Sequence, residues 1–297
     1  MNAAYISHLQ HFSLGDGPGI RTTVFFKGCN LHCPWCHNPE TISVKPQLLF
    51  YPSLCTSCGK CASVCGRHTW IDGEHHFDRQ GCDACGRCVQ ACPAEALSLC
   101  GERQTIQKLM SHIREDWEFY AMSGGGVTLS GGEALLQADS CRELAARCSK
   151  ENIPVLLDTA GCVDYGAFEK VLPYLSLCYF DLKSGTQSGY DAVGGKLDLV
   201  LENMKRLVAD GVETVARIPV IPGFNDTRED TLQMAEALCG TGVRKVHLLP
   251  FHRLGSGKYA GLGQIYSYEE TLPPPAKTLE TMLEVFQHSG FSASKGG

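Results

Sequence analysis

Short apolar runs alternate with amphipathic segments along most of the chain, and this alternation is its main signal of fold. Six short runs are rich in β-branched, aromatic and aliphatic residues, and each predicts a buried strand. They are residues 22–26, 127–129, 155–157, 178–182, 214–218 and 246–249. Segments with apolar residues at helical spacing predict helices near residues 102–121, 139–150, 164–172, 197–210, 227–239 and 276–288. These six β/α units predict an α/β fold with a parallel sheet, and they suit a partial (β/α)6 TIM-like barrel better than a closed eightfold one.

Unusual polar residues stand at one end of these predicted strands. In barrels, catalytic groups lie on the loops that follow the carboxyl ends of the strands. A cysteine motif follows the first predicted strand, and the later strands end at or precede Glu133, Asp158, Thr159, Asp181, Lys183, Arg217 and His252. Since strand residues alternate between faces, His247 and His252 are not both expected to point inward, and we favour His252 at the rim. The sequence therefore predicts a functional site at this rim.

The pattern changes between residues 51 and 100. This stretch is rich in Cys and Gly and shows little periodicity, which predicts an inserted module. We expect residues 1–50 and 101–297 to form the barrel and residues 51–100 to form the insert.

Composition narrows the class of protein. The chain has 26 Lys and Arg against 32 Asp and Glu, and its net charge of −6 argues against binding to nucleic acid or to an anionic membrane. The sequence shows neither an apolar run long enough to span a membrane nor a signal peptide at its start. Under those conditions, 17 cysteines favour metal ligation in a reducing compartment over disulfides. We expect a cytoplasmic protein.

The first cysteine motif is Cys29, Cys33 and Cys36, in a C-x3-C-x2-C pattern directly after the first predicted strand. Three thiolates are one ligand fewer than a closed zinc site or a 4Fe–4S cluster usually takes. An unfilled coordination position is where a metal centre does chemistry, so these three residues are the expected catalytic centre. A structural zinc site completed by His32 or His37 is the alternative.

Two further cysteine runs lie inside the predicted insert. Each has the C-x2-C-x2-C-x3-C spacing of bacterial ferredoxins, in which the fourth cysteine of each run ligates the other cluster. Gly66 stands where a proline is usual, and paired zinc knuckles are the alternative. We expect one cluster on Cys55, Cys58, Cys61 and Cys92, and a second on Cys82, Cys85, Cys88 and Cys65. The neighbouring His75 and His76 are expected to be solvated, and the six remaining cysteines receive no role.

The first motif, with Trp35 before its last cysteine, resembles the cluster motif of the radical S-adenosylmethionine (SAM) superfamily. The segments Asp16-Gly17-Pro18-Gly19-Ile20-Arg21 and His37-Asn38-Pro39-Glu40 narrow the resemblance to activating enzymes of glycyl radical enzymes, which include the pyruvate formate-lyase activating enzyme. The resemblance implies a radical SAM oxidoreductase with three 4Fe–4S clusters, counting those of the insert. The insert resembles those of the members that serve dehydratases, decarboxylases and carbon–nitrogen or carbon–sulfur lyases.

The resemblance also implies cofactor-binding roles. Gly131, Gly132 and Glu133 match a segment that contacts the methionine amino group of SAM, with Ala134 in place of a common proline. Asp158, Thr159, Asp181 and Lys183 resemble positions near the cofactor and a monovalent cation, Na⁺ or K⁺. The oxygen atoms of Asp158, Thr159 and Asp181 suit a hard cation, but a strand-end Asp that caps the next helix is an open alternative. Trp35, Arg217 and His252 complete the expected cofactor site, with Arg217 pairing the cofactor carboxylate.

The function implied is the activation of a partner protein. An external donor such as flavodoxin or ferredoxin would supply an electron, reductive cleavage of SAM would give a 5′-deoxyadenosyl radical, and the radical would take the α-hydrogen of a specific glycine in a glycyl radical enzyme. Two alternatives stay open: a radical SAM enzyme that acts on a small molecule or peptide, and a ferredoxin-type electron carrier. The joint presence of DGPGIR, GGGVTLSGGE and RIPVIPG opposes the first. A ferredoxin-type carrier would leave the motif of Cys29, Cys33 and Cys36 and the six β/α units unexplained, which opposes the second.

Overall fold

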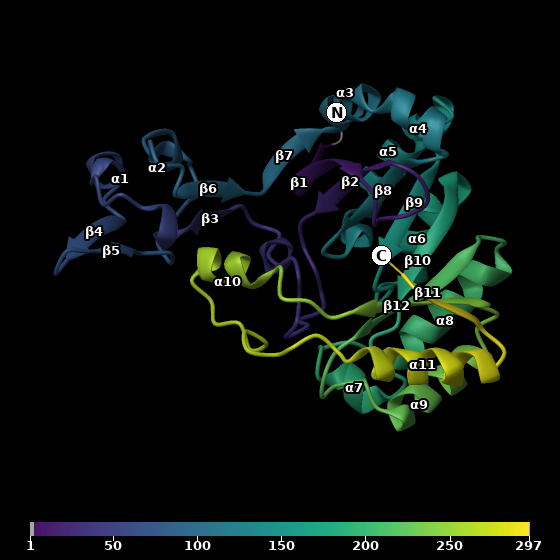
Figure 1. Ribbon diagram of the computed structural model, residues 1–297. Coiled ribbons are helices and arrows are strands. Elements are labelled where there is room, and N and C mark those ends of the chain that lie inside the picture. The colour runs from purple at the N-terminus through teal and green to yellow at the C-terminus, as the bar shows by residue number, and fades with distance from the viewer. Residues whose placement is uncertain (1–2, 297) are drawn as a thin grey trace.

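A single large sheet organises the computed structural model, which describes residues 3–296 (Figure 1). All six predicted strands are present, as β2 (Arg21–Phe26), β8 (Gly126–Gly131), β9 (Val155–Thr159), β10 (Leu175–Asp181), β11 (Thr214–Val220) and β12 (Lys245–Pro250). The sequence did not indicate β1 (Ala3–Ser13), β7 (Glu102–Thr105) and β13 (Ser292–Lys295). Polar residues are mixed into β1, and β7 and β13 are short and mostly exposed, so none of the three shows a clear apolar pattern.

The sheet is mostly parallel. Within residues 3–296 its nine strands run in the order β13-β12-β11-β10-β9-β8-β2-β1-β7. Every neighbouring pair from β2 to β13 is parallel, whereas β1 lies antiparallel to both β2 and β7. The parallel α/β fold expected from the sequence is confirmed, and the carboxyl ends of six successive strands meet at one edge.

Helices follow the strands as the apolar spacing predicts. The connecting helices are α5 (Ala138–Lys150), α6 (Tyr165–Val171), α8 (Leu197–Ala209), α9 (Arg228–Cys239) and α11 (Ala276–His288). Side chains cap the start of two of them, α6 and α9. At α9 the Thr227 hydroxyl accepts a bond from the Asp230 amide, and the Asp230 carboxylate accepts one from the Thr227 amide. Two short helices, α7 (Gln187–Asp191) and α10 (Ser256–Leu262), lie in loops.

The single helix predicted at residues 102–121 is wrong. Its first residues form strand β7, whose residues 102–105 pair with residues 3–6 of β1. The rest divides into α3 (Ile106–Glu115) and α4 (Trp117–Ser123), with Asp116 between them. The Asp116 backbone leaves the helical region at φ −99° and ψ 7°. Its carboxylate accepts a hydrogen bond from the Thr22 hydroxyl on β2, so a tertiary contact fixes the break between the helices.

Packing of the apolar helix faces against the sheet makes the core rigid. Phe168 of α6 stacks on Phe180 of β10 with 5.8 Å between ring centroids, and both side chains are fully buried. Met234 of α9 and Phe286 of α11 are buried as completely. Each such side chain contributes about 1.5–3 kcal/mol relative to exposure. The sheet edge that carries the polar residues therefore rests on a fixed scaffold.

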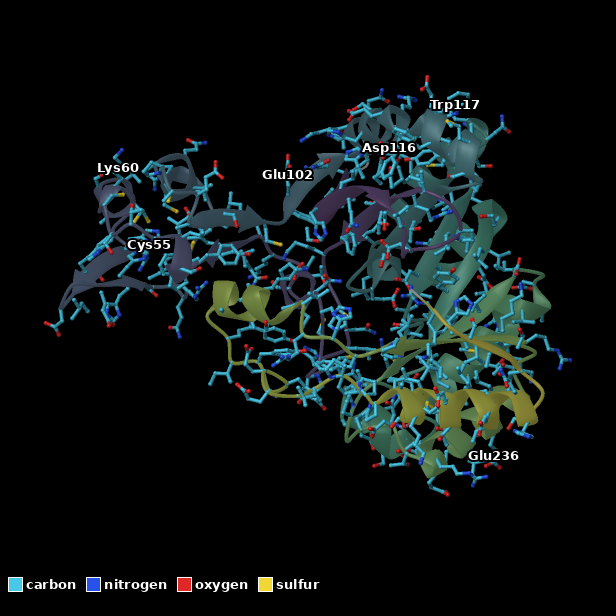
Figure 2. The ribbon with its side chains drawn as sticks, in the orientation of Figure 1. Cys55, Lys60, Glu102, Asp116, Trp117 and Glu236 are labelled. Atoms are coloured by element: carbon cyan, nitrogen blue, oxygen red, sulfur yellow. The ribbon has the colours of Figure 1, made fainter. Side chains whose placement is uncertain are left out.

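Residues 47–100 extend away from the sheet (Figure 1). They hold β3 (Gln47–Phe50), α1 (Lys60–Val64), β4 (His68–Ile71), β5 (Glu74–Phe77), α2 (Arg87–Gln90) and β6 (Leu97–Cys100). Antiparallel pairing of β3 with β6 closes the extension at its base. Arg79 fastens it to α10, since its guanidinium donates to the Leu48 carbonyl at 3.0 Å and to the Gly261 carbonyl at 2.9 Å. Figure 2 shows many sulfur atoms gathered in this extension, around Cys55.

Across residues 3–296, the structure contains no helix both long and apolar enough to cross a membrane.

Candidate functional site

A cavity of about 810 Å³ opens at the carboxyl edge of the parallel strands. Loops that follow several strands contribute to its wall, as the barrel argument predicts. Most residues expected at the site line it: Cys29, Cys33, Trp35, Cys36, Gly131, Gly132, Asp158, Thr159, Asp181, Lys183, Arg217 and His252. The fold thus brings together residues up to about two hundred positions apart in the chain.

The cysteine loop leaves β2 through Gly28, whose φ of 102° suits glycine. Backbone bonds hold the loop: the Gly28 amide donates to the Thr41 carbonyl at 2.7 Å, and the His32 amide donates to the Val193 carbonyl at 2.9 Å. Trp35 is buried and packs on Phe224 with 4.3 Å between ring centroids. These contacts fix the path of the loop that carries the three cysteines.

The cysteine side chains themselves fit a cationic metal centre. Burial is the main cause that raises the pKa of the Cys29 thiol to about 11 and that of the Cys36 thiol to about 12, and the neighbouring Cys33 thiol contributes to both rises. Burial likewise raises the pKa of Cys33. Three buried thiols on one cavity wall become thiolates only beside a strong positive charge, and soft thiolates are the ligands of iron–sulfur clusters. This donor set fits an iron–sulfur cluster that leaves one position for another ligand.

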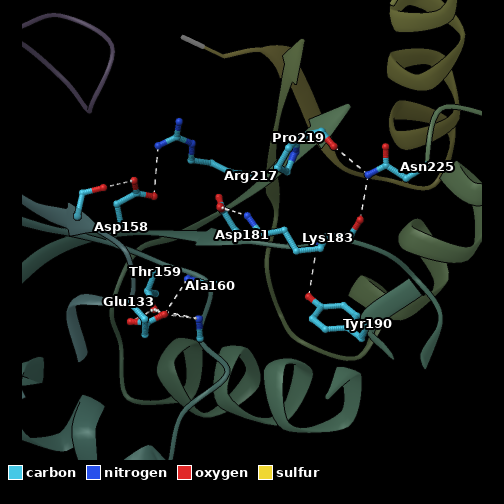
Figure 3. A network of polar contacts seen from close by, with 12 residues as sticks. Glu133, Asp158, Thr159, Ala160, Asp181, Lys183, Tyr190, Arg217, Pro219 and Asn225 are labelled. Atoms are coloured by element: carbon cyan, nitrogen blue, oxygen red, sulfur yellow. Dashed lines mark hydrogen bonds and ion pairs between the residues drawn. The ribbon is translucent and has the colours of Figure 1, made fainter. Parts of the chain in front are cut away.

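Glu133 is absent from the described residues that line the cavity. The side chain is fully buried and points into the loop after β9 (Figure 3). It accepts bonds from the Thr159 hydroxyl at 2.8 Å and from the amides of Ala160 and Gly161 at 3.1 and 3.2 Å. Burial raises its pKa, while these bonds oppose the rise. Glu133 therefore fixes the loop at 159–161, and the neighbouring Gly131 and Gly132 remain at the cavity wall.

Gly131 must be glycine for a steric reason. Its φ is 110°, and a Cβ atom there would lie 2.4 Å from the backbone N and O atoms of Phe26. The glycine thus lets β8 end directly against β2 beside the cysteine loop. A backbone this accessible can donate and accept bonds at the cavity wall.

Opposite charges alternate across the cavity floor (Figure 3). Arg217 Nη1 lies 3.3 Å from Asp158 Oδ1, and the Ser130 hydroxyl donates to Asp158 Oδ2 at 2.8 Å. Lys183 Nζ donates to Asp181 Oδ2 at 2.6 Å. Burial works against charge on both cations, but Asp158 raises the pKa of Arg217, and Asp181 raises that of Lys183. Arg217 and Lys183 are therefore permanent positive charges facing the cavity.

These pairs bear on the expected cation site. Asp158 and Asp181 already neutralise cationic side chains, and the Thr159 hydroxyl bonds to Glu133. The oxygen atoms expected to hold Na⁺ or K⁺ are thus engaged within the protein. By contrast, Arg217 Nη1 is buried and donates no hydrogen bond to the described residues, so it can donate to an anionic ligand.

Two histidines and an aspartate complete the cavity wall. His252 lines it and stacks on His37 with 4.0 Å between ring centroids. Burial and then His252 lower the pKa of His37 to about 4, which keeps its ring neutral. His247 instead meets Tyr179 outside the cavity lining, with 5.8 Å between ring centroids. The sequence argument missed Asp16 as a lining residue, although the DGPG segment that carries it was its signal.

In the extension formed by residues 47–100, a cysteine of the second run lies among cysteines of the first. A small cavity is lined by Cys55, Cys58 and Cys61 of the first run together with Cys92 of the second. On the other side, burial raises the pKa of Cys88 to about 11, and Cys65 and then Cys82 add to the rise. Cys92 thus lies beside the first run, and Cys65 lies close enough to Cys82 and Cys88 to interact with them electrostatically.

The expected solvation of His75 is wrong. Its Nε2 lies 2.9 Å from His68 Nδ1 and 3.8 Å from Cys61 Sγ, and its ring packs on Trp70 and Phe50. His76 is exposed as expected, because alternate residues of β5 point to opposite faces. Among cysteines without a predicted role, Cys100, Cys141, Cys148, Cys162 and Cys178 are buried and Cys239 is exposed.

Family models match three parts of the chain. The Radical SAM superfamily model matches residues 105–235. A 4Fe-4S single cluster domain model matches residues 15–65, and a 4Fe-4S binding domain model matches residues 75–98. The last two matches include all three cysteine motifs between them.

Curated proteins are similar over nearly the whole chain. The benzylsuccinate synthase activating enzyme of Thauera aromatica is 37% identical over 100% of this chain and 94% of its own length. The pyruvate formate-lyase 2-activating enzyme of Escherichia coli (strain K12) is 38% identical with the same coverage of both proteins. A solved domain of the pyruvate-formate lyase-activating enzyme from Bacteroides vulgatus ATCC 8482 aligns with a TM-score of 0.50 at 24% identity, covering 58% of this chain and 99% of that chain, which supports the fold.

Proposed function

Because the chain belongs to the activating enzymes of glycyl radical enzymes, we propose that the cavity at the strand ends is where it activates a partner enzyme. Enzymes of this family are radical SAM oxidoreductases. Bound at such a site, a 4Fe–4S cluster and SAM supply a 5′-deoxyadenosyl radical, which abstracts the α-hydrogen of one glycine of the partner. The observation that carries the proposal is the cavity itself, where Cys29, Cys33 and Cys36 face the charged floor.

The side chains of the cavity have distinct tasks. The cluster would be held by Cys29, Cys33 and Cys36. Three cysteines leave one iron atom of a four-iron cluster without a protein ligand, and the amino and carboxylate groups of SAM would bind there. Gly131 and Gly132 offer backbone groups to the methionine end. Arg217 would donate to the SAM carboxylate through Nη1, which lies 3.3 Å from Asp158 Oδ1 but makes no hydrogen bond to the described residues.

The monovalent cation remains a prediction of the resemblance. Its ligands would have to include Asp158 and Asp181, whose carboxylates pair with Arg217 and Lys183 in the structure. Binding of Na⁺ or K⁺ there would require one of these pairs to open.

We also propose that the sheet is a partial barrel whose open side admits the partner. Within the described residues, β13 and β7 are the two edges of the sheet, and they are not paired with each other. At the cavity, Leu14 and Leu254 are 68% and 84% exposed while contributing to its lining. Exposed apolar residues at the mouth of a polar cavity suit contact with a protein chain better than with water. A glycine-bearing loop of the partner would enter between them.

Residues 51–100 would form a ferredoxin-like insert with two 4Fe–4S clusters, and residues 1–50 and 101–297 the barrel. The small cavity that joins Cys92 to the first cysteine run supports this assignment. The insert would relay electrons from an external donor, such as flavodoxin or ferredoxin, toward the cavity. Its attachment to α10 through Arg79 keeps it in place beside the residues that follow β12.

The cluster assignment predicts the iron content. Protein reconstituted under anaerobic conditions should hold about 12 iron atoms per chain, as three four-iron clusters. A Cys92→Ala variant should disturb the cluster of the first run, leaving the coordination of Cys82, Cys85 and Cys88 unchanged. Iron analysis with Mössbauer spectroscopy checks both. Zinc in place of iron, or about 8 iron atoms in the wild-type protein, would contradict the assignment.

The function is tested with a partner enzyme chosen from the neighbouring genes. Incubation with SAM and a strong reductant should give the doublet of a glycyl radical in the electron paramagnetic resonance spectrum. A partner with its radical-site glycine replaced by alanine is the matched control and should give no doublet. If SAM is cleaved while a small molecule or peptide is modified and every partner stays silent, the alternative radical SAM function replaces this one.

A further inference from the structure

A second group of potential ligands lies where β1 meets the end of α3. His11, His112 and Glu115 each bring one ligand atom, and these atoms all lie within 4.8 Å of one another. The three residues are absent from the lining of the large cavity in the described part of the chain. Figure 2 shows the adjacent Asp116 at the α3–α4 end of the molecule, far from the cysteine-rich extension around Cys55.

The helix presents two of these ligands together. His112 and Glu115 are three residues apart, which places them on the same face of α3, and His112 Nδ1 lies 3.3 Å from Glu115 Oε1. Both belong to the last turn of α3. The carbonyl end of a helix carries a partial negative charge, so a cation bound there is stabilised.

The third potential ligand, His11, is held in place by Asp116. His11 Nδ1 lies 2.7 Å from Asp116 Oδ2, and this carboxylate is buried and also accepts a bond from the Thr22 hydroxyl. In metal sites, a carboxylate commonly holds one nitrogen of a ligating imidazole and thereby leaves the other free for the metal. Asp116 thus gives His11 the support of a metal ligand.

The backbone of β1 is distorted at this place. The pairing of β1 with β2 is irregular between Gln10 and Ser13, and Phe12 has a φ of 57°, which is rare for a bulky residue. Bulges of this kind redirect side chains and recur beside functional sites. The distortion includes His11, and the packing of Phe12 on Phe119, with 4.7 Å between ring centroids, helps to hold it.

We propose that His11, His112 and Glu115 form a binding site for a divalent transition-metal ion, with Zn²⁺ the ion that suits the donors best. Two imidazoles and one carboxylate are usual zinc ligands, and water would take the fourth position. Mg²⁺ and Ca²⁺ prefer oxygen ligands only and fit less well. The side chain of Glu115 is 60% exposed, so an ion can reach the site from solvent.

Such an ion would link β1 to α3 across about a hundred residues of chain. β1 leads directly into residues 14–16, which line the large cavity. The metal would therefore stabilise the end of β1, and with it the position of residues 14–16 in the wall of the large cavity. The inference stands independently of the proposed function, because it uses no residue of that cavity.

The test uses protein with its iron–sulfur clusters already loaded, washed with a chelator and then dialysed against limiting Zn²⁺. We expect one zinc ion per chain beyond the clusters. Zinc-edge X-ray absorption should show only nitrogen and oxygen neighbours near about 2.0 Å, with imidazole scattering and no sulfur near about 2.3 Å. Replacing His112 with alanine should weaken zinc binding by at least about 100-fold, since one of three protein ligands is lost.

A Glu115→Gln variant should weaken binding in the same direction, whereas Glu118→Gln, an exposed carboxylate on the next helix, should leave it unchanged. Iron content and the thermal midpoint of the zinc-free proteins show whether the variants are folded. Sulfur in the zinc shell, or full zinc binding in both the His112 and the Glu115 variants, would overturn the proposal. Failure to take up zinc at micromolar concentration would overturn it as well.

Discussion

Replacing Cys29, Cys33 and Cys36 together with alanine is expected to abolish reductive cleavage of SAM. The three sulfurs share one wall of the cavity, and no other cysteine among the described residues lines it. Without them the cluster has no protein ligand there, so SAM has nothing to coordinate. The iron content should fall by about four atoms per chain, while the clusters of the insert assemble. Chromatographic measurement of 5′-deoxyadenosine after reduction with dithionite checks the result.

The matched control replaces three cysteines outside the motifs, Cys100, Cys162 and Cys239. This variant loses the same number of thiols but should retain cleavage, at the cost of a modest loss of stability from its two buried positions. Cleavage that persists in the triple variant of the motif would show that the cavity is not the catalytic site. Cleavage lost in both variants would show that the loss reflects folding and not ligation.

Replacing Arg217 with methionine should destabilise the protein by about 3 kcal/mol or more and weaken SAM binding. The substitution leaves the Asp158 carboxylate buried without its counter-ion, and breaking one side of a buried pair is among the costliest single changes. Methionine keeps an unbranched apolar side chain but loses the guanidinium, whose Cζ lies 5.0 Å from the centroid of the Tyr179 ring. Thermal unfolding followed by circular dichroism, and SAM titration, measure the two effects.

The loss of stability in the Arg217→Met variant should be larger at higher pH. Burial already raises the pKa of Asp158, and Arg217 opposes that rise, so removing Arg217 raises the pKa further. A carboxyl group whose pKa is higher in the folded state contributes stability at low pH and loses it as pH rises through the folded pKa. The gap in unfolding midpoint between variant and wild type should therefore be wider at pH 8 than at pH 6.

A second substitution separates the two roles of Arg217. Asp158→Asn in the Arg217→Met background removes the buried charge, and it should recover much of the lost stability and flatten the pH dependence. SAM binding should stay weak, because the donor to its carboxylate is still missing. Recovery of SAM binding along with stability would contradict the direct role of Arg217.

Much of the fold followed from local pattern. The strands that carry the site are short apolar runs rich in β-branched and aliphatic residues, and α11 begins and ends where the spacing predicts. The cysteine motifs depend on spacing along the chain, so they are visible without any tertiary information. Arg217 and Asp158 were expected at one rim because parallel strands place their carboxyl ends together.

What the sequence did not reveal depends on contacts between distant residues. Glu133 turned away from the cavity because backbone amides at 160 and 161 take its carboxylate, and backbone donors leave no trace in a sequence pattern. Residues 102–105 are polar and directly precede the helical spacing that begins at Ile106, but they pair with β1, because the free sheet edge offers them hydrogen bonds. His75 is packed by a hairpin whose polar sequence resembles a solvated loop.

The central claim is that this chain takes a hydrogen atom from a glycine of a partner protein. The most direct test supplies a partner enzyme grown with glycine carrying deuterium at the α-carbon, together with SAM and a reductant. The claim predicts that 5′-deoxyadenosine gains deuterium, and that the gain disappears when the radical-site glycine of the partner is alanine. Abundant 5′-deoxyadenosine that contains no deuterium with any glycyl radical partner would contradict the claim.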